Sequence, residues 1–213
     1  MIVVRAGEFT MGSGAKESSH PDEKPEHVVK ISKSFAAGKF EVTFEKWAAC
    51  VADESCKQLD DEGWGRADRP VINVDWNAAK AYVAWLSKKT GKTYRLLSES
   101  ECEYAARGGT AWFWGSIDDG LGVPEACLFA NTHDQSGKQE NRGFNWLEHP
   151  CEDGFAKTAP VGKFKPNSFG LYDMLGNVQE WVEDCHGLYK DAPRDGTPAK
   201  PNDCEERVTR GGA

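Results

Sequence analysis

A long stretch without periodic pattern, residues 109–167, is the feature that most constrains how this chain can fold. Its apolar residues follow neither the 3.6-residue spacing of a helix nor the alternation of a strand. Structureless loops of this length are uncommon inside a compact domain. We therefore expect something other than regular secondary structure, such as bound ions or disulfide bonds, to order the middle of the chain.

Composition favours one loop-rich globular domain over residues 1–213. A hydrophobic fraction of 39%, with 8 Trp and 10 Phe, supplies enough apolar material for a core. The 22 Gly and 10 Pro favour turns and loops over a helix bundle or a parallel sheet. The sequence therefore predicts an irregular α+β fold rather than a repetitive one.

Charge and hydropathy exclude two classes of partner. The formal net charge is −8, and lysine and arginine are not clustered as phosphate binding requires, so we expect no nucleic-acid partner. No apolar stretch approaches the roughly 20 residues that cross a bilayer, so we expect no membrane span. The first residues lack an export signal and enter strand-like sequence at once, which indicates that this domain is part of a longer protein.

Local patterns predict a few elements around the aperiodic stretch. The expected strands cover residues 2–4, 9–11, 27–31 and 94–97, and the expected helices cover 43–52, 77–89 and 98–107. Phe44, Trp47 and Ala48 are expected to form the buried face of the first helix. Ser98 and Glu101 have the spacing of a capping box, and Gly91 is placed to end the second helix.

Seven cysteines are many for a cytosolic protein. Three pairs bracket irregular stretches, which predicts the disulfides Cys50–Cys56, Cys127–Cys151 and Cys185–Cys204 and leaves Cys102 unpaired. The alternative is a set of reduced, buried cysteines. No C-x-x-C or Cys/His spacing indicates zinc. Three disulfides would place the protein outside the cytoplasm, in the periplasm or in the medium.

Oxygen-bearing side chains in two irregular segments are candidates for binding a hard cation. Asn131 and Asp153 lie in the aperiodic stretch, and Asp173 and Glu180 flank a Gly-Asn turn. Ca²⁺ takes six to eight oxygen ligands and accepts backbone carbonyls beside carboxylates. Asn and Asp in turns also commonly bind only their own backbone, so the pattern alone leaves both interpretations open.

Other kinds of catalytic site find little support. The 5 histidines show no H-x-x-x-H spacing, and the chain has neither a G-x-S-x-G elbow nor a phosphate-binding loop ending in Gly-Lys-Ser/Thr.

Five segments, in this order, resemble the formylglycine-generating (sulfatase-modifying factor) family: GEFTMGS, FEVTFEKW, RPVINVDWNAAKAYVAWLSKKTGKTYRLLSESECEYAARGG, TAPVGKFKPNSFGLYDMLGNVQEW and RVTRGG. The chain looks like a bacterial member of the group that includes ergothioneine-synthesis and pyoverdine-maturation proteins. The resemblance implies a compact variant of the C-type lectin fold, with two main helices beside small antiparallel sheets.

The resemblance also implies two calcium sites. One would use Asn131, Thr132, Asp153 and Phe155, and the other Asp173, Gly176, Val178 and Glu180. The threonine, phenylalanine, glycine and valine would contribute backbone carbonyls.

Enzymes of the family convert a sulfatase cysteine to formylglycine, using oxygen and copper held by two cysteines that follow an RGG motif. Cu(I) favours soft thiolate ligands, so this chemistry needs both sulfurs. Here the RGG motif is followed only by Ala213, so the sequence predicts a domain truncated at its C-terminal end, without catalytic residues. Copper would bind only if a further segment supplied cysteines. Cys102 and Gln179 also stand where the family commonly has tryptophan.

Two functions follow from these expectations. The first is a non-catalytic scaffold that binds a protein, a peptide or a small ligand at its lectin-like face. The alternative is a copper- and oxygen-dependent oxidase that acts on a peptide cysteine when the C-terminal segment is complete. The sequence leaves open whether the protein is an enzyme.

Overall fold

The computed structural model describes residues 1–13, 21–110, 126–140, 143, 148–200 and 203–212. Its strands form three two-stranded antiparallel sheets. β1 (Ile2–Val4) pairs with β4 (Phe35–Ala37), β2 (Gly7–Met11) with β3 (His27–Ile31), and β5 (Gln179–Cys185) with β6 (Arg207–Gly211). The sheets are short because long loops separate the strands.

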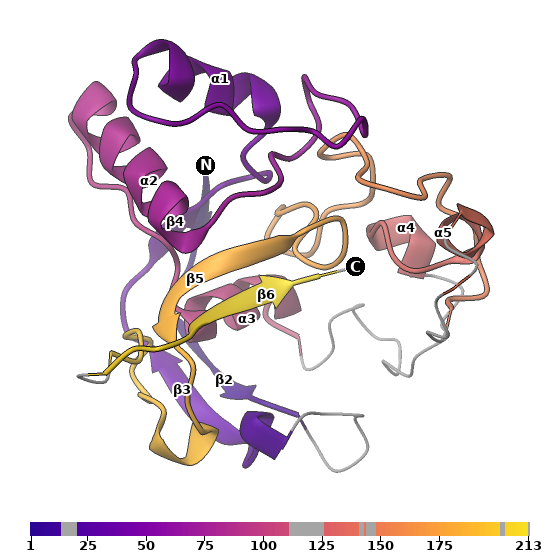
Figure 1. Ribbon diagram of the computed structural model, residues 1–213. Coiled ribbons are helices and arrows are strands. Elements are labelled where there is room, and N and C mark those ends of the chain that lie inside the picture. Colours follow the sequence, from indigo (N-terminus) through magenta and orange to yellow (C-terminus); the bar gives the residue numbers. More distant parts are fainter. Residues whose placement is uncertain (14–20, 111–125, 141–142, 144–147, 201–202, 213) are drawn as a thin grey trace.

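Three main helices accompany these sheets (Figure 1). They are α1 (Phe44–Ala52), α2 (Trp76–Thr90) and α3 (Glu99–Arg107). Shorter helical segments are η1 (Pro21–Glu23), α4 (Ala126–Phe129), α5 (Gln135–Glu140) and η2 (Tyr189–Asp191). The predicted α+β class with small antiparallel sheets is confirmed. Among the described helices, none combines the length and the apolar character that a membrane span requires.

Side chains cap the main helices as the sequence suggests. Thr43 accepts a hydrogen bond from the Lys46 amide, and Ser98 and Glu101 form a reciprocal capping box at the start of α3. Gly91 ends α2 in the left-handed conformation, at φ 68°. These local signals set the helix boundaries. The predicted boundaries of α1, α2 and α3 are confirmed within one or two residues.

Three expectations about local structure differ from the structure. Residues 94–97 form no strand, because the Tyr94 amide donates to Ser87 Oγ at 2.8 Å rather than to a strand partner. Ala48 is exposed, and Cys50 is buried in its place on α1. The aperiodic stretch also contains α4 and α5, which are too short to show helical periodicity.

Two apolar clusters form the core. The larger joins the N-terminal strands to α3, and it contains Val4, Met11, Val29, Ile31, Ala37, Tyr104, Ala105, Leu171 and Tyr189. The smaller lies between α1 and α2, where the rings of Trp47 and Tyr82 stack with centroids 5.3 Å apart. Cys50 belongs to this second cluster, so its disulfide ties the loop after α1 to the core.

The three predicted disulfides are all present, and Cys102 is free and buried. Their sequence separations are 6, 24 and 19 residues for Cys50–Cys56, Cys127–Cys151 and Cys185–Cys204. Each bridge closes a segment with little regular structure, which restricts the unfolded chain.

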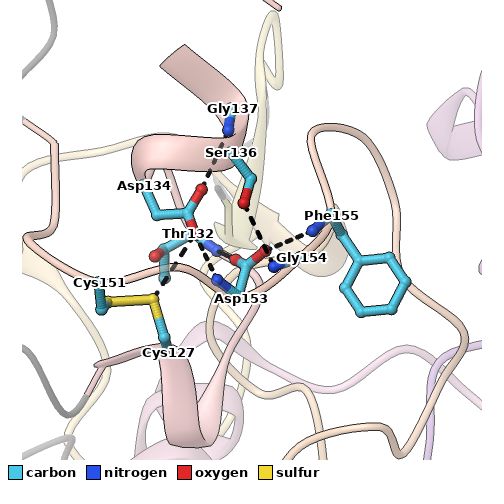
Figure 2. Close-up of a disulfide and its surroundings, with 9 residues drawn as sticks. All are labelled: Cys127, Thr132, Asp134, Ser136, Gly137, Cys151, Asp153, Gly154 and Phe155. Atoms are coloured by element: carbon cyan, nitrogen blue, oxygen red, sulfur yellow. Dashed lines mark hydrogen bonds between the residues drawn. A yellow bond between two sulfur atoms is a disulfide. The ribbon is translucent and has the colours of Figure 1, made fainter. Parts of the chain in front are cut away.

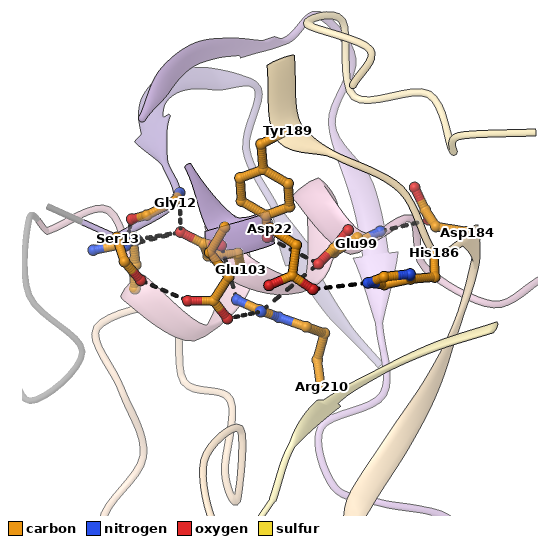
Figure 3. Close-up of polar contacts among 11 residues, drawn as sticks. Gly12, Ser13, Asp22, Glu99, Glu103, Asp184, His186, Tyr189 and Arg210 are labelled. Carbon is orange, nitrogen blue, oxygen red and sulfur yellow. Dashed lines mark hydrogen bonds and ion pairs between the residues drawn. The ribbon is translucent and has the colours of Figure 1, made fainter. Parts of the chain in front are cut away.

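A buried charge cluster joins three parts of the chain that are distant in sequence (Figure 3). Glu103 of α3 accepts from Arg107 Nε at 2.9 Å, from Arg210 of β6 at 2.8 Å and from the Gly12 amide at 3.1 Å. Only 1% of the Glu103 side chain is exposed. This carboxylate therefore holds the N-terminal hairpin and β6 against α3.

We expect Glu103→Ala to lower the free energy of unfolding by about 3–5 kcal/mol, since it leaves the buried Arg107 guanidinium and the partly buried Arg210 guanidinium without their shared carboxylate. Glu205→Ala, which removes an exposed carboxylate, should change it by less than about 0.5 kcal/mol. Urea denaturation followed by circular dichroism measures both. Equal midpoints for the two variants would contradict the role given to Glu103.

Candidate functional site

The two segments that carry the predicted calcium ligands lie directly against each other. The Asn177 amide donates to the Asn131 carbonyl at 2.8 Å, and Asn131 Nδ2 donates to Asn177 Oδ1 at 3.1 Å. A side chain at Gly176, where φ is 76°, would collide with the same Asn131 carbonyl. The close approach therefore requires glycine at this position.

In the first predicted site, the Asp153 carboxylate connects Thr132 and Phe155 (Figure 2). Its Oδ2 accepts from the Thr132 amide at 2.9 Å and its Oδ1 from the Phe155 amide at 2.7 Å. The disulfide Cys127–Cys151 joins the two segments just before the site residues. Thr132, Asp153 and Phe155 therefore lie together, and the Asn131 side chain, next to Thr132 in the chain, donates to the Lys157 carbonyl at 2.6 Å.

Asp134 is a member of this region that the sequence analysis missed. It is fully buried and accepts hydrogen bonds from the amides of Gly137 and Asp153. Burial, and to a lesser extent the Asp134 charge, raises the pKa of Asp153. Cys127 Sγ lies near both carboxylates, but it belongs to a disulfide and is not a thiolate ligand.

In the second predicted site, Asp173 has one oxygen without a partner. Its Oδ2 accepts from the Gly162 amide at 2.6 Å, whereas its Oδ1 is buried and has no hydrogen-bond donor. The Asp173 backbone adopts the left-handed region, at φ 54°. Burial raises the pKa of its carboxyl.

Two further carboxylates lie near Asp173. Burial, followed by the Asp173 charge, raises the pKa of Glu180 to about 7. Glu41, which precedes α1, has a pKa raised first by burial and then by Glu180 and Asp173. Three partly or fully buried carboxyl groups thus destabilise one another's charged forms.

The oxygen atoms at the two predicted calcium sites suit a hard cation. All side-chain candidates are carboxylates or amides, and Thr132 Oγ1, Asp173 Oδ1 and Glu41 Oε1 are buried oxygens without a protein donor. Buried polar atoms are normally hydrogen-bonded. A divalent cation would satisfy the two carboxylate oxygens and neutralise charges that burial disfavours.

A cavity of about 560 Å³ opens beside both site segments. Aromatic side chains of Trp64, Phe155 and Trp181 line it together with the polar side chains of Asn73, His133, Thr158 and Gln179. Asn131, Thr132, Asn177 and Val178 also belong to its wall, so the candidate cation ligands and the cavity share residues.

The thiol chemistry available to this cavity is limited. All seven cysteines lie in the described part of the chain, and six of them form disulfides. Burial, followed by the Glu180 charge, raises the pKa of Cys102 to about 12. Residues 1–213 therefore contain no pair of free thiols that could hold Cu(I).

These features define an irregular α+β domain whose loops present oxygen-rich pockets beside a cavity. Residues 1–213 match the sulfatase-modifying factor enzyme 1-like domain, and the chain belongs to this family. Family members bind calcium and copper.

Relatives in this family include proteins named as active and as inactive enzymes. The chain is 35% identical over 151 residues to the formylglycine-generating enzyme of Mus musculus, covering 70% of this chain and 36% of that protein. It is 40% identical over 119 residues to the inactive C-alpha-formylglycine-generating enzyme 2 of Bos taurus, covering 53% and 32%. The chain thus spans about a third of the length of these relatives.

A solved structure resembles the whole chain. PvdO from Pseudomonas aeruginosa superimposes with a TM-score of 0.81 and 38% identity, covering 99% of this chain and 80% of that one. The likeness supports the fold and the family.

Cys102 should resist alkylation by iodoacetamide at pH 8 in the native protein, because its thiol is buried and stays protonated. Unfolding without reductant should expose one reactive thiol per chain, and unfolding with reductant should expose seven. Mass spectrometry counts the adducts. Labelling of several cysteines before reduction would contradict the disulfide assignment.

Proposed function

We propose that this domain is a calcium-stabilised binding module that takes a peptide or a small ligand in the cavity beside its cation sites, without catalysing an oxidation. The observation that carries this proposal is the combination of a 560 Å³ cavity with a chain that holds no pair of free thiols. Disulfides persist in oxidising compartments, so the module works outside the cytoplasm.

Calcium at the second site would be held by Asp173 and Glu180 through their carboxylates and by Gly176 and Val178 through their carbonyls. The unpartnered Oδ1 of Asp173 supports this assignment. The ion would supply positive charge where carboxylates are buried with raised pKa values. Its contribution is structural, since it joins Asp173 to β5.

Calcium at the first site would be held by the side chains of Asn131 and Asp153 and by the carbonyls of Thr132 and Phe155. Asp153 already contacts both carbonyl-bearing residues through their amides. The Cys127–Cys151 disulfide fixes the same two segments covalently. The ion and the disulfide would together order a part of the chain that has little secondary structure.

Thorough chelation with EDTA should lower the melting temperature, and added calcium should restore it. A ligand that binds only the native state stabilises it, by about 3 kcal/mol when its concentration is 100 times Kd. Asp173→Asn and Asp153→Asn should each reduce the calcium-dependent shift. Differential scanning calorimetry with and without calcium measures it.

Asp191→Asn is the matched control, since it removes an exposed carboxylate on η2, which contributes no residue to either site. It should keep the full calcium-dependent shift. If chelation leaves the melting temperature unchanged and elemental analysis finds no metal, the calcium proposal is wrong.

The cavity favours an amphipathic ligand. Trp64 is partly exposed at its edge and offers an apolar face. Asn73, Thr158 and Gln179 place amide and hydroxyl groups on the same wall. Pockets of this size with aromatic walls and a few polar groups are typical of small-molecule or peptide binding.

The alternative function is a copper-dependent oxidase of a peptide cysteine. The 35% identity with the mouse formylglycine-generating enzyme favours it. The chain spans only 36% of that enzyme, so a thiol pair could come from chain outside these residues. In that case the same cavity would receive the peptide that is oxidised.

Residues 1–213 should show no formylglycine-generating activity. The protein is incubated with Cu(I), oxygen, a reductant and a cysteine peptide of the sulfatase type, and mass spectrometry reports any conversion of the cysteine to an aldehyde. We expect none, because Cu(I) finds no thiol pair. Turnover that disappears in Cys102→Ser would show that the domain is catalytic and that its active site lies at α3.

A further inference from the structure

A second, smaller cavity lies beside the one assigned to ligand binding. Its volume is about 140 Å³, and most of the side chains that line it are apolar. Ala79, Tyr82 and Val83 contribute from α2, Leu96 from the loop before α3, and Trp181 from β5. The smaller cavity therefore lies where α2 faces the beginning of β5.

The two cavities share part of their walls. The residues that line both of them are Val71, Val74, Val178, Gln179 and Trp181. The Trp181 indole donates to the Val74 carbonyl at 2.7 Å, which fixes two of these shared residues against each other. Gln179 is exposed, so both cavities reach the surface beside the same side chain. A single ligand can therefore occupy both.

The two cavities differ in their chemistry. The larger one has Lys157 and several amide and hydroxyl groups in its wall. The charged residues of the smaller one are Glu41 and Glu180, which belong to the carboxylates beside the second calcium site. Glu41 accepts a hydrogen bond from Asn177 Nδ2 at 2.8 Å and another from the Val178 backbone. Apart from these carboxylates and the shared glutamine, the described wall of the smaller cavity is aliphatic and aromatic.

An apolar wall favours an apolar occupant. Moving an apolar group from water into such a pocket is favourable in proportion to the area that it buries. A polar group would lose its hydrogen bonds with water and find few partners. Apolar cavities of about 150 Å³ hold a molecule of benzene. The smaller cavity, at about 140 Å³, therefore accommodates an isobutyl or phenyl group, whereas the fused rings of an indole are too large.

We propose that the smaller cavity is a side-chain subsite of the binding site, and that the ligand is a peptide with one apolar anchor of leucine or phenylalanine size. The peptide backbone would lie in the larger cavity, where amide and hydroxyl groups can pair with it. The anchor would pass Gln179 into the smaller cavity. This inference rests on the proposed function and adds the class of ligand.

Affinity selection from a peptide library tests the inference. The calcium-loaded protein is incubated with acetylated tripeptide amides that contain every residue type except cysteine. Mass spectrometry then identifies the peptides that co-elute with the protein in size-exclusion chromatography. Leucine or phenylalanine should be enriched about tenfold over alanine at one position, because burying such a side chain strengthens binding. Tryptophan should not be enriched, because the smaller cavity is too small for it.

Ala79→Leu tests the position of the anchor. Ala79 lines the smaller cavity and not the larger one, so a leucine side chain there should fill the subsite. The variant should lose the preference for apolar side chains and bind polar peptides as wild type does. Ala81→Leu is the matched control, since it makes the same change at an exposed position of α2, and it should keep the preference.

Benzene provides a test in the wild-type protein. It fits an apolar cavity of this size and has no polar group for the larger one. Added benzene should therefore displace peptides that carry an apolar anchor and leave the binding of peptides without one unchanged. Circular dichroism shows whether each variant is folded, and if Ala79→Leu is not, the benzene competition decides.

The outcomes distinguish the subsite from the proposed function. Retained peptides without an apolar preference, or with a preference for lysine or arginine, would overturn the subsite. So would an apolar preference that persists in benzene or in folded Ala79→Leu. In these cases the cavity still binds peptides, and the proposed function stands. If the protein retains no peptide at all, the proposed binding of peptides is itself wrong.

Discussion

The buried carboxylate of Glu103 fixes how the N-terminal hairpin, α3 and β6 pack together. It is shared by two guanidinium groups, from Arg107 on its own helix and from Arg210 on β6, and it also accepts the Gly12 amide (Figure 3). A buried ion pair contributes little net stability compared with an apolar core, but it strongly disfavours arrangements that leave one charge unpaired. The N-terminal hairpin and β6 are thus held against α3 in one specific arrangement.

Elsewhere, side-chain amides and carboxylates replace the hydrogen bonds that long strands would provide. Asn167 Oδ1 accepts from the amides of Phe169 and Leu171, and its Nδ2 donates to the Ala105 carbonyl. Asp184 accepts from the amides of Glu99 and Ala199. These contacts satisfy backbone groups of loops that have no ladder partner. The abundance of Asn, Asp and Gly therefore reflects how this fold meets its hydrogen-bond requirement.

Whether a feature can be predicted from the sequence depends on how far apart in the chain its interacting residues lie. Helix starts at Thr43 and Ser98 were predictable because a cap acts within one turn. The pairing of β5 with β6 was not predicted, since a register shift interrupts it and the intervening chain is irregular. Among site residues, those adjacent to a recognisable motif were found, whereas Asp134 and Glu41 were missed. Their roles depend on partners that only the tertiary fold supplies.

Asn177 shows why an amide, and not another residue, connects the two candidate cation sites. Its Oδ1 accepts from Asn131 Nδ2 and from the Ala159 amide, while its Nδ2 donates to Glu41 Oε2 and to the Ala159 carbonyl. An aspartate would lose both donated bonds and add a negative charge beside Glu41. An apolar residue would leave buried polar groups unsatisfied on both sides. Only a side chain that donates and accepts at once can join a carboxylate-rich site to an amide-lined one, so the two sites share one structural element.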